Sequence, residues 1–175
     1  DVVVENKDVF RVLVEALREQ GYEERQDLAA AYEDLSPSIV LEQQGFPRWD
    51  IFVEVVADAV HLTPAMRERS TETRTFGSLT VHLLSLTDIF VFKTVTEREG
   101  DLEDAALIAQ QGAVDWQQVL EEVETQESVT DQYFSFAVLD TLDLLVERYG
   151  IDVPTRDRLA SYCLENALAL TLDEP

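Results

Sequence analysis

The chain has 175 residues, which is room for one ordinary domain or for a compact domain with a helical extension, and this length excludes two large domains. Hydrophobic residues make up 46% of the chain and charged residues 28%, which is typical of a soluble globular protein rather than of a disordered acidic tail. Lysine and arginine number 13 against 36 aspartate and glutamate residues, so the net charge is −23, which repels nucleic acid at low salt.

The basic residues are unusual in kind as well as in number. Lys7 and Lys93 are the only lysines, and the other charged bases are arginines. An acid-rich, lysine-poor surface stays hydrated in concentrated salt, where a Debye length of about 3 Å screens the repulsion between carboxylates. We therefore expect a salt-adapted, halophilic protein of the cytoplasm, whose charge reflects its habitat before its partners.

Cysteine content and hydropathy predict the compartment. The single cysteine, Cys163, lies among apolar residues and cannot form a disulfide within the chain, so a buried thiol in a reducing compartment is expected. No stretch approaches the roughly 20 apolar residues that a membrane span needs, and no signal peptide is visible. These features predict an intracellular protein without a membrane partner.

The first residues predict a strand followed by a helix. Residues 1–5 form a short run rich in β-branched side chains, and Asn6 is a suitable N-cap for a helix that ends at Gly21. The chain begins at Asp1 without a methionine and already inside the predicted strand. We therefore expect a segment upstream of it.

The rest of the first half mixes helix and strand signals. A second helix is predicted over residues 27–35. Residues 39–41 and 51–56 flank a turn with glycine and proline, and predict an antiparallel hairpin. Residues 57–69 give mixed signals, whereas the threonine-rich stretch 71–84 alternates enough for one or two strands that complete the sheet.

From residue 85 onward, apolar residues recur at helical spacing. The fold class is therefore α+β, with a small mixed sheet and flanking helices in residues 1–84 and a helical bundle packed on it in residues 85–175. Five helices are predicted in the second half, with Gly100, Gly112 and Gly150 as stops: residues 86–96, 101–111, 115–125, 130–149 and 154–170.

Several enzyme classes lack support in the sequence. The two histidines do not have the spacing of a zinc site. No nucleophile elbow, cysteine–histidine pair or phosphate-binding loop is present. The candidate functional residues are instead carboxylates and a lysine.

Lys93 is the most informative residue of the chain. It lies in the otherwise apolar segment 86–95, although the protein has nearly eliminated lysine. Helical spacing places it beside Ile89 and Phe90, at the edge of a buried face, where an ammonium needs an anion. It either extends to solvent or pairs with a structural carboxylate, or it contacts the phosphate or carboxylate of a ligand.

Asp101 and Asp104 follow Lys93 after one short turn and share one face at the start of a predicted helix. Both residues suit the positive end of that helix, where Asp101 can serve as the cap. Their short distance from Lys93 along the chain also allows a carboxylate to meet the ammonium. Both interpretations remain open.

Asp1 and Asp50 each open a predicted strand. By alternation, Asp50 shares a face with Phe52 and Glu54. Two carboxylates on neighbouring strands can hold a hard divalent ion through oxygen, which is a common arrangement for magnesium and a nucleoside triphosphate. The alternative is that these carboxylates only solvate the surface, as most do in an acidic protein.

Together these segments resemble a minimal nucleotidyltransferase, of the kind grouped with the AbiEii toxins of bacterial and archaeal toxin–antitoxin pairs. The resemblance covers nearly the whole first half and the first two helices of the second. Its most specific part is the lysine followed by an arginine and two spaced aspartates. The segments that carry it are residues 1–4, 48–52, 84–89, Lys93 and 98–104.

The resemblance assigns a role to each candidate residue. In the family, a Gly-Ser pair opens a helix, the next strand carries two carboxylates separated by one residue, and a later strand carries a third. Asp1 corresponds to the second carboxylate and Asp50 to the third, so both are expected to bind Mg²⁺ or Mn²⁺ and to activate the attacking hydroxyl.

The same resemblance assigns the nucleotide contacts to the segment after the sheet. Lys93 corresponds to the family lysine that contacts the triphosphate or orients the site, and Asp104 corresponds to its carboxylate partner. Asp101 is the alternative match. Lys93, Arg98 and Asp101 are accordingly expected to bind the nucleotide.

The chain departs from the family pattern at its start. The Gly-Ser pair and the first carboxylate are absent, and Gly77-Ser78 comes too late in the chain to replace them. Either an upstream segment carries them, or the protein is a degenerate member of the family.

Three functional hypotheses follow. The leading one is transfer of a nucleoside monophosphate from a nucleoside triphosphate to a hydroxyl of RNA or protein. The second is a catalytically inactive interaction module of a toxin–antitoxin-type pair, which would bind an antitoxin-like protein through the helices after Thr130. The third is a salt-adapted domain whose carboxylates only solvate it.

Overall fold

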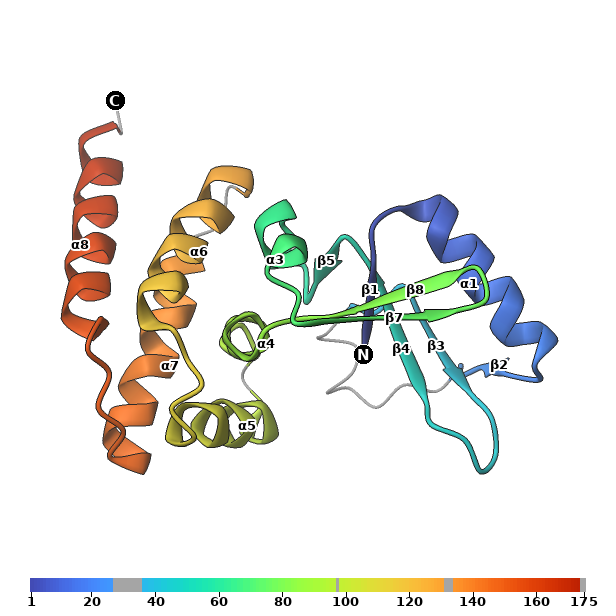
Figure 1. Ribbon diagram of the computed structural model, residues 1–175. Coiled ribbons are helices and arrows are strands. Elements are labelled where there is room, and N and C mark those ends of the chain that lie inside the picture. Colours follow the sequence, from blue (N-terminus) through green and yellow to red (C-terminus); the bar gives the residue numbers. More distant parts are fainter. Residues whose placement is uncertain (27–35, 97, 131–133, 174–175) are drawn as a thin grey trace. The chain divides into compact units, whose positions relative to one another are not determined.

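The computed structural model describes residues 1–26, 36–96, 98–130 and 134–173, and shows an α+β protein (Figure 1). About 52% of the residues are helical and 18% lie in strands, which confirms the predicted fold class. The chain divides into two compact units, residues 1–62 and 63–175, which we call the N-terminal unit and the C-terminal unit. The predicted helix over residues 27–35 lies outside the described residues.

The N-terminal unit is built on a four-stranded sheet with the order β1-β4-β3-β2. β1 runs parallel to β4, and the other neighbours are antiparallel. Leu41, Ile51 and Phe52 of the two middle strands are almost completely buried and form the centre of its core. The strands are β1 (Val2–Val4), β2 (Glu23–Glu24), β3 (Ile39–Glu42) and β4 (Trp49–Val53).

Helix α1 (Lys7–Glu19) follows β1, as the sequence predicts. The Asn6 side chain accepts hydrogen bonds from the backbone N–H groups of Asp8 and Val9, each at 3.0 Å, and so caps the helix. Gly21 follows the helix with φ +92°, a conformation that glycine adopts without strain. Leu13, Val14 and Leu17 form the buried face of the helix.

The predicted hairpin is confirmed, but its second strand ends earlier than expected. β3 pairs antiparallel with β4, with Val40 opposite Asp50. Glu54 has φ +64°, which interrupts the strand predicted to run to Val56. The Glu54 N–H donates to the Val4 carbonyl at 2.9 Å, and the chain then enters a separate small pair, β5 (Val55–Val56) and β6 (Val60–His61).

The C-terminal unit begins with a short helix and a hairpin. Helix α3 (Pro64–Glu68) has Thr63 as its N-cap and proline in its first turn. β7 (Glu72–Phe76) and β8 (Leu79–Leu83) pair only with each other, so the threonine-rich stretch forms a sheet of its own instead of completing the first one. The hairpin belongs to the C-terminal unit, which begins at Thr63.

Helices form the rest of the C-terminal unit. Its core contains Phe90, Val138, Leu142 and Leu145, all completely buried, and the ring of Phe90 packs edge-to-face on Trp116 at a centroid distance of 5.5 Å. The helices are α4 (Leu86–Lys93), α5 (Glu99–Gln110), α6 (Trp116–Val129), α7 (Phe134–Tyr149) and α8 (Arg156–Asp173).

One of the three predicted glycine stops is wrong. Gly112 and Gly150 follow α5 and α7 with φ +67° and +64°, as expected of glycines that end helices. Gly100 instead lies inside the first turn of α5, which begins at Glu99. A glycine is tolerated there because the first N–H groups of a helix have no partner within it.

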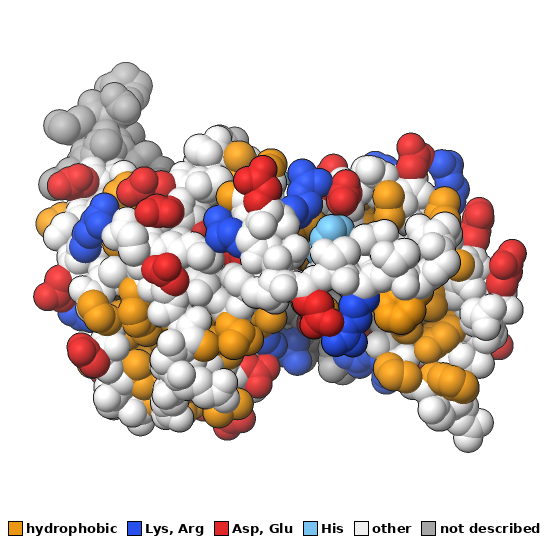
Figure 2. Space-filling model, in the orientation of Figure 1, with side chains coloured by type: hydrophobic (Ala, Val, Ile, Leu, Met, Phe, Trp, Pro, Cys, Tyr) orange, Lys and Arg blue, Asp and Glu red, His pale blue; other side chains and the backbone are white. Residues whose placement is uncertain are grey.

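No helix in the described part of the chain combines the length and the apolar character that a membrane span requires. Acidic side chains are spread over the face drawn in Figure 2 and are not gathered into one patch. On that face, the negative charge therefore does not mark a single binding surface.

Candidate functional site

The candidate residues form two groups, one in each unit. Asp1 and Asp50 belong to the N-terminal unit, whereas Lys93, Arg98, Asp101 and Asp104 belong to the C-terminal unit.

Asp50 lies in β4, and Asp1 directly precedes β1, the neighbouring strand. In the parallel pairing of β1 with β4, Val2 is opposite Ile51, so continuing this register by one residue puts Asp1 opposite Asp50. Residues at the same level of a parallel pair point to the same face of the sheet, on strands about 4.8 Å apart. The register therefore puts the two residues that the sequence singled out at the same end of β1 and β4, Asp1 exposed and Asp50 buried.

The two oxygens of the Asp50 carboxylate have different surroundings. The side chain is only 5% exposed, and its Oδ2 accepts a hydrogen bond of 2.6 Å from Nη2 of Arg48. Oδ1 is buried and has no hydrogen-bond partner among the described residues. An unpartnered buried carboxylate oxygen is costly, so Oδ1 is a strong acceptor for a cation or a donor.

These features fit a divalent metal ion. Mg²⁺ prefers oxygen ligands and is often held by one or two carboxylates together with the phosphates of a substrate. Asp1 and Oδ1 of Asp50 would be the carboxylates of such a site. No cluster of three or more metal-binding side chains occurs in the ranges that the structure describes.

The second group surrounds Lys93, at the end of α4. Its Nζ lies 2.5 Å from Oδ1 of Asp101 and 2.9 Å from Oδ2 of Asp104, so the ammonium meets both aspartates of α5. The Thr96 hydroxyl donates to Oδ2 of Asp101 at 2.6 Å, and Nη1 of Arg98 lies 3.7 Å from the same oxygen. The expected contact of Lys93 with a carboxylate is present.

The charges of this group stabilise each other. Burial by itself lowers the pKa of Lys93, but hydrogen bonds and charge attraction from Asp101 and Asp104 outweigh it and raise the pKa above the ordinary value. Burial by itself raises the pKa of Asp101, but Lys93 and Thr96 outweigh it and lower the pKa. Both groups are therefore charged at neutral pH.

A groove of about 380 Å³ lies beside this group within the C-terminal unit. Lys93, Arg98 and Arg148 line it, together with Asp140 and Glu99. Arg148 pairs with Glu99 at 3.2 Å. The groove therefore presents both signs of charge, and it offers hydrogen-bond donors and acceptors to a small polar molecule.

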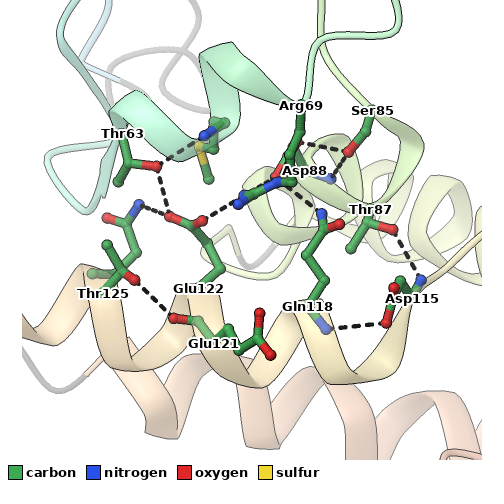
Figure 3. A network of polar contacts seen from close by, with 12 residues as sticks. Thr63, Arg69, Ser85, Thr87, Asp88, Asp115, Gln118, Glu121, Glu122 and Thr125 are labelled. Carbon is green, nitrogen blue, oxygen red and sulfur yellow. Dashed lines mark hydrogen bonds and ion pairs between the residues drawn. The ribbon is translucent and has the colours of Figure 1, made fainter.

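The most buried charges of the described chain were not singled out by the sequence. Figure 3 shows the Arg69 guanidinium between the carboxylates of Asp88 and Glu122, whose side chains are 0% and 1% exposed. Nη2 of Arg69 lies 2.6 Å from an oxygen of each carboxylate. We call these three residues the Arg69 network.

Neighbouring polar side chains complete the Arg69 network. The Ser85 hydroxyl donates to Asp88 at 2.6 Å, and the Thr63 hydroxyl donates to Glu122 at 3.0 Å. Burial by itself lowers the pKa of Arg69, but its bonds to the two carboxylates outweigh it and raise the pKa. The network joins the end of α3 to α4 and α6, and so holds the helix that carries Lys93.

One sequence signal could have found part of this network. Asp88 lies in the same apolar segment that drew attention to Lys93. Arg69 and Glu122 are distant from it along the chain and are two among many charged residues, so nothing in the sequence connects them.

No protein-family model matches the chain, and a search of curated protein sequences finds no match.

Proposed function

We propose that this protein is a divalent-metal-dependent nucleotidyltransferase, which transfers a nucleoside monophosphate from a nucleoside triphosphate to a hydroxyl of RNA or protein. The observation that carries the proposal is the buried, unpartnered oxygen of Asp50 on β4, in a register that puts Asp1, directly before β1, opposite Asp50. The resemblance in sequence assigned metal binding to the same two residues.

In the proposed reaction, the acceptor hydroxyl gives up its proton to solvent water, and its oxygen bonds to the α-phosphorus. The bond from the α-phosphorus to the bridging oxygen breaks, and pyrophosphate leaves. Asp1 and Asp50 would hold the metal ion, which would supply positive charge for the phosphate oxygens and lower the cost of the hydroxyl's deprotonation. Asp50 orients its free Oδ1 for this task through the bond from Arg48 to its other oxygen.

The resemblance assigns the triphosphate contact to Lys93 and Arg98. Lys93 has two carboxylate partners. A phosphate contact therefore requires the ammonium to share its hydrogens between a phosphate and at least one aspartate, which an ammonium with three donors can do.

The test is transfer of label from each α-labelled nucleoside triphosphate by the protein expressed from its full reading frame. The assay contains molar potassium chloride and magnesium, with RNA and protein of the same cells as acceptors. Asp50→Asn is the test variant, and Glu15→Gln, which removes one negative charge from an exposed position of α1, is its matched control. We expect transfer by the wild type and by the control but not by Asp50→Asn; equal transfer by Asp50→Asn would refute the proposal.

One observation favours the second candidate, a catalytically inactive interaction module that binds an antitoxin-like protein. Asp101 and Asp104 already account for the buried position of Lys93 without any ligand. A folded wild-type protein that transfers no label from any of the nucleotides would support the module. Co-purification of the protein with one stoichiometric partner from its own cells would then identify the partner.

A further inference from the structure

Arg48 determines which oxygen of Asp50 remains open. It lies two residues before Asp50, directly ahead of β4, and its guanidinium contacts the Asp50 carboxylate. Its guanidinium holds Oδ2 at 2.6 Å, whereas Oδ1 is buried without a partner among the described residues. The side chain of Arg48 is 30% exposed and reaches both this carboxylate and solvent.

The charges of these residues weaken the binding of a divalent metal ion that arrives without a nucleotide. Asp1 and Asp50 supply two negative charges, and Arg48 already supplies one positive charge within hydrogen-bond distance of Asp50. A divalent ion at Oδ1 would lie on the same carboxylate as the guanidinium, and the two cations would repel each other at short range. Salt screens this repulsion only partly, because the carboxylate is buried.

A metal–triphosphate complex changes this balance. The triphosphate carries more negative charge than the metal ion carries positive charge, so the complex as a whole attracts a guanidinium. Arginine presents several N–H donors in a planar fork and can contact a phosphate while it keeps a bond to a carboxylate. The same side chain therefore opposes a bare metal ion and favours a metal ion that arrives with its nucleotide.

Resting on the proposed function, we infer that Arg48 selects the form in which the metal enters. The site binds the divalent ion as its nucleoside triphosphate complex, and Arg48 moves part of its hydrogen bonding from Asp50 to a phosphate when that complex arrives. Arg48 is thus a positioning residue for Asp50 in the empty site and a phosphate ligand in the occupied one.

The test measures Mn²⁺ binding by electron paramagnetic resonance of the free ion, with and without a non-hydrolysable α,β-methylene nucleoside triphosphate. The proteins are the wild type, Arg48→Met and the control Arg18→Met, which removes an exposed arginine of α1 that pairs with Glu24. The buffer has the lowest potassium chloride concentration that keeps the far-ultraviolet spectrum native.

We expect Arg48→Met to bind Mn²⁺ alone roughly tenfold more tightly, and Mn²⁺ with the analogue roughly tenfold more weakly, than the wild type. Arg18→Met should match the wild type in both titrations. A purely structural role of Arg48 would shift both affinities in the same direction, so shifts of one sign, or no shifts, would overturn the inference. Arg48→Gln, which keeps an N–H donor for Asp50 without the charge, should show the same opposite shifts and serves if Arg48→Met does not fold.

The same titrations separate the two proposals. Wild-type protein that binds no Mn²⁺ with or without the analogue, or Asp50→Asn with unchanged affinity, would refute the metal site and the inference together. Wild-type binding that depends on Asp50, combined with same-sign shifts in the Arg48 variants, would refute only the inference.

Discussion

Replacing Arg69 by methionine should destabilise the C-terminal unit more than any exposed substitution. The change leaves the carboxylates of Asp88 and Glu122, 0% and 1% exposed, without their shared cation. Removing one partner of a buried ion pair costs about 3–5 kcal/mol. Because 27% of the Arg69 side chain is exposed, solvent weakens the interaction, and we expect about 3 kcal/mol, the low end of that range.

Urea unfolding followed by circular dichroism measures this loss, with Arg74→Met as the matched control. Arg74 lies in β7 and pairs with Glu72, and both side chains are at least half exposed, so its replacement should cost less than about 0.5 kcal/mol. The melting temperature of Arg69→Met should fall by about 10 °C. A loss below about 1 kcal/mol, or one equal to that of the control, would refute the view that the network stabilises the unit.

A combined variant tests the cause of the loss. Adding Asp88→Asn and Glu122→Gln to Arg69→Met removes both buried charges and keeps the shapes of the side chains. We expect the combined variant to regain roughly half of the lost stability, because the amides leave no uncompensated charge. Further loss in the combined variant would show that packing, not charge, explains the effect of Arg69→Met.

Three further predictions concern single positions. Burial alone would raise the pKa of Asp101, but hydrogen bonds from Lys93 and Thr96 outweigh burial and lower the pKa below its ordinary value of 3.8. The ionised carboxylate therefore stabilises the fold above the ordinary pKa, and this stabilisation is lost as the pH falls through the lowered pKa of the folded state. In urea titrations, the stability gap between wild type and Asp101→Asn should be constant from about pH 5 to pH 8 and should shrink below about pH 4; an unchanged gap would contradict the ion pair. Burial raises the pKa of the Cys163 thiol, so a disulfide reagent should modify it at least about 100-fold more slowly in the native protein than in urea, and similar rates would show that the thiol is accessible. Gly150→Ala should cost about 1 kcal/mol because φ is +64°, whereas Gly100→Ala in helix α5 should stabilise by about 0.5 kcal/mol; thermal shifts of equal sign would contradict these backbone assignments.

The sequence predicted those parts of the fold that short segments determine. Asn6 and Gly21 bound helix α1 through contacts within a few residues, so their signals are readable without the rest of the chain. The end of β4 could not be predicted from its own segment. Glu54 has a left-handed conformation there, and its N–H donates to the carbonyl of Val4, which is far away along the chain. Gly100 was misassigned because glycine marks a helix stop only when it follows the last turn.

In the candidate site, too, contacts between residues close along the chain were predictable and contacts between distant residues were not. The contact between Lys93 and the aspartates of α5 was predictable because one short turn separates them. The pairing of Arg69 with Glu122 was not, because an acidic chain offers an arginine many carboxylates at similar distances along the sequence. The placement of Asp1 opposite Asp50 needed the register of two strands, which composition and periodicity do not determine.

The parallel pairing of β1 with β4 also has a consequence for how the protein acquires its function. β3 and β4 are joined by a short turn and can pair early, whereas β1 reaches β4 only after a loop that contains most of the N-terminal unit has closed. On loop-closure entropy alone, the pairing that puts Asp1 opposite Asp50 is expected to form after the hairpin. A partly folded chain that has only the hairpin would therefore lack one of the two carboxylates of the proposed metal site.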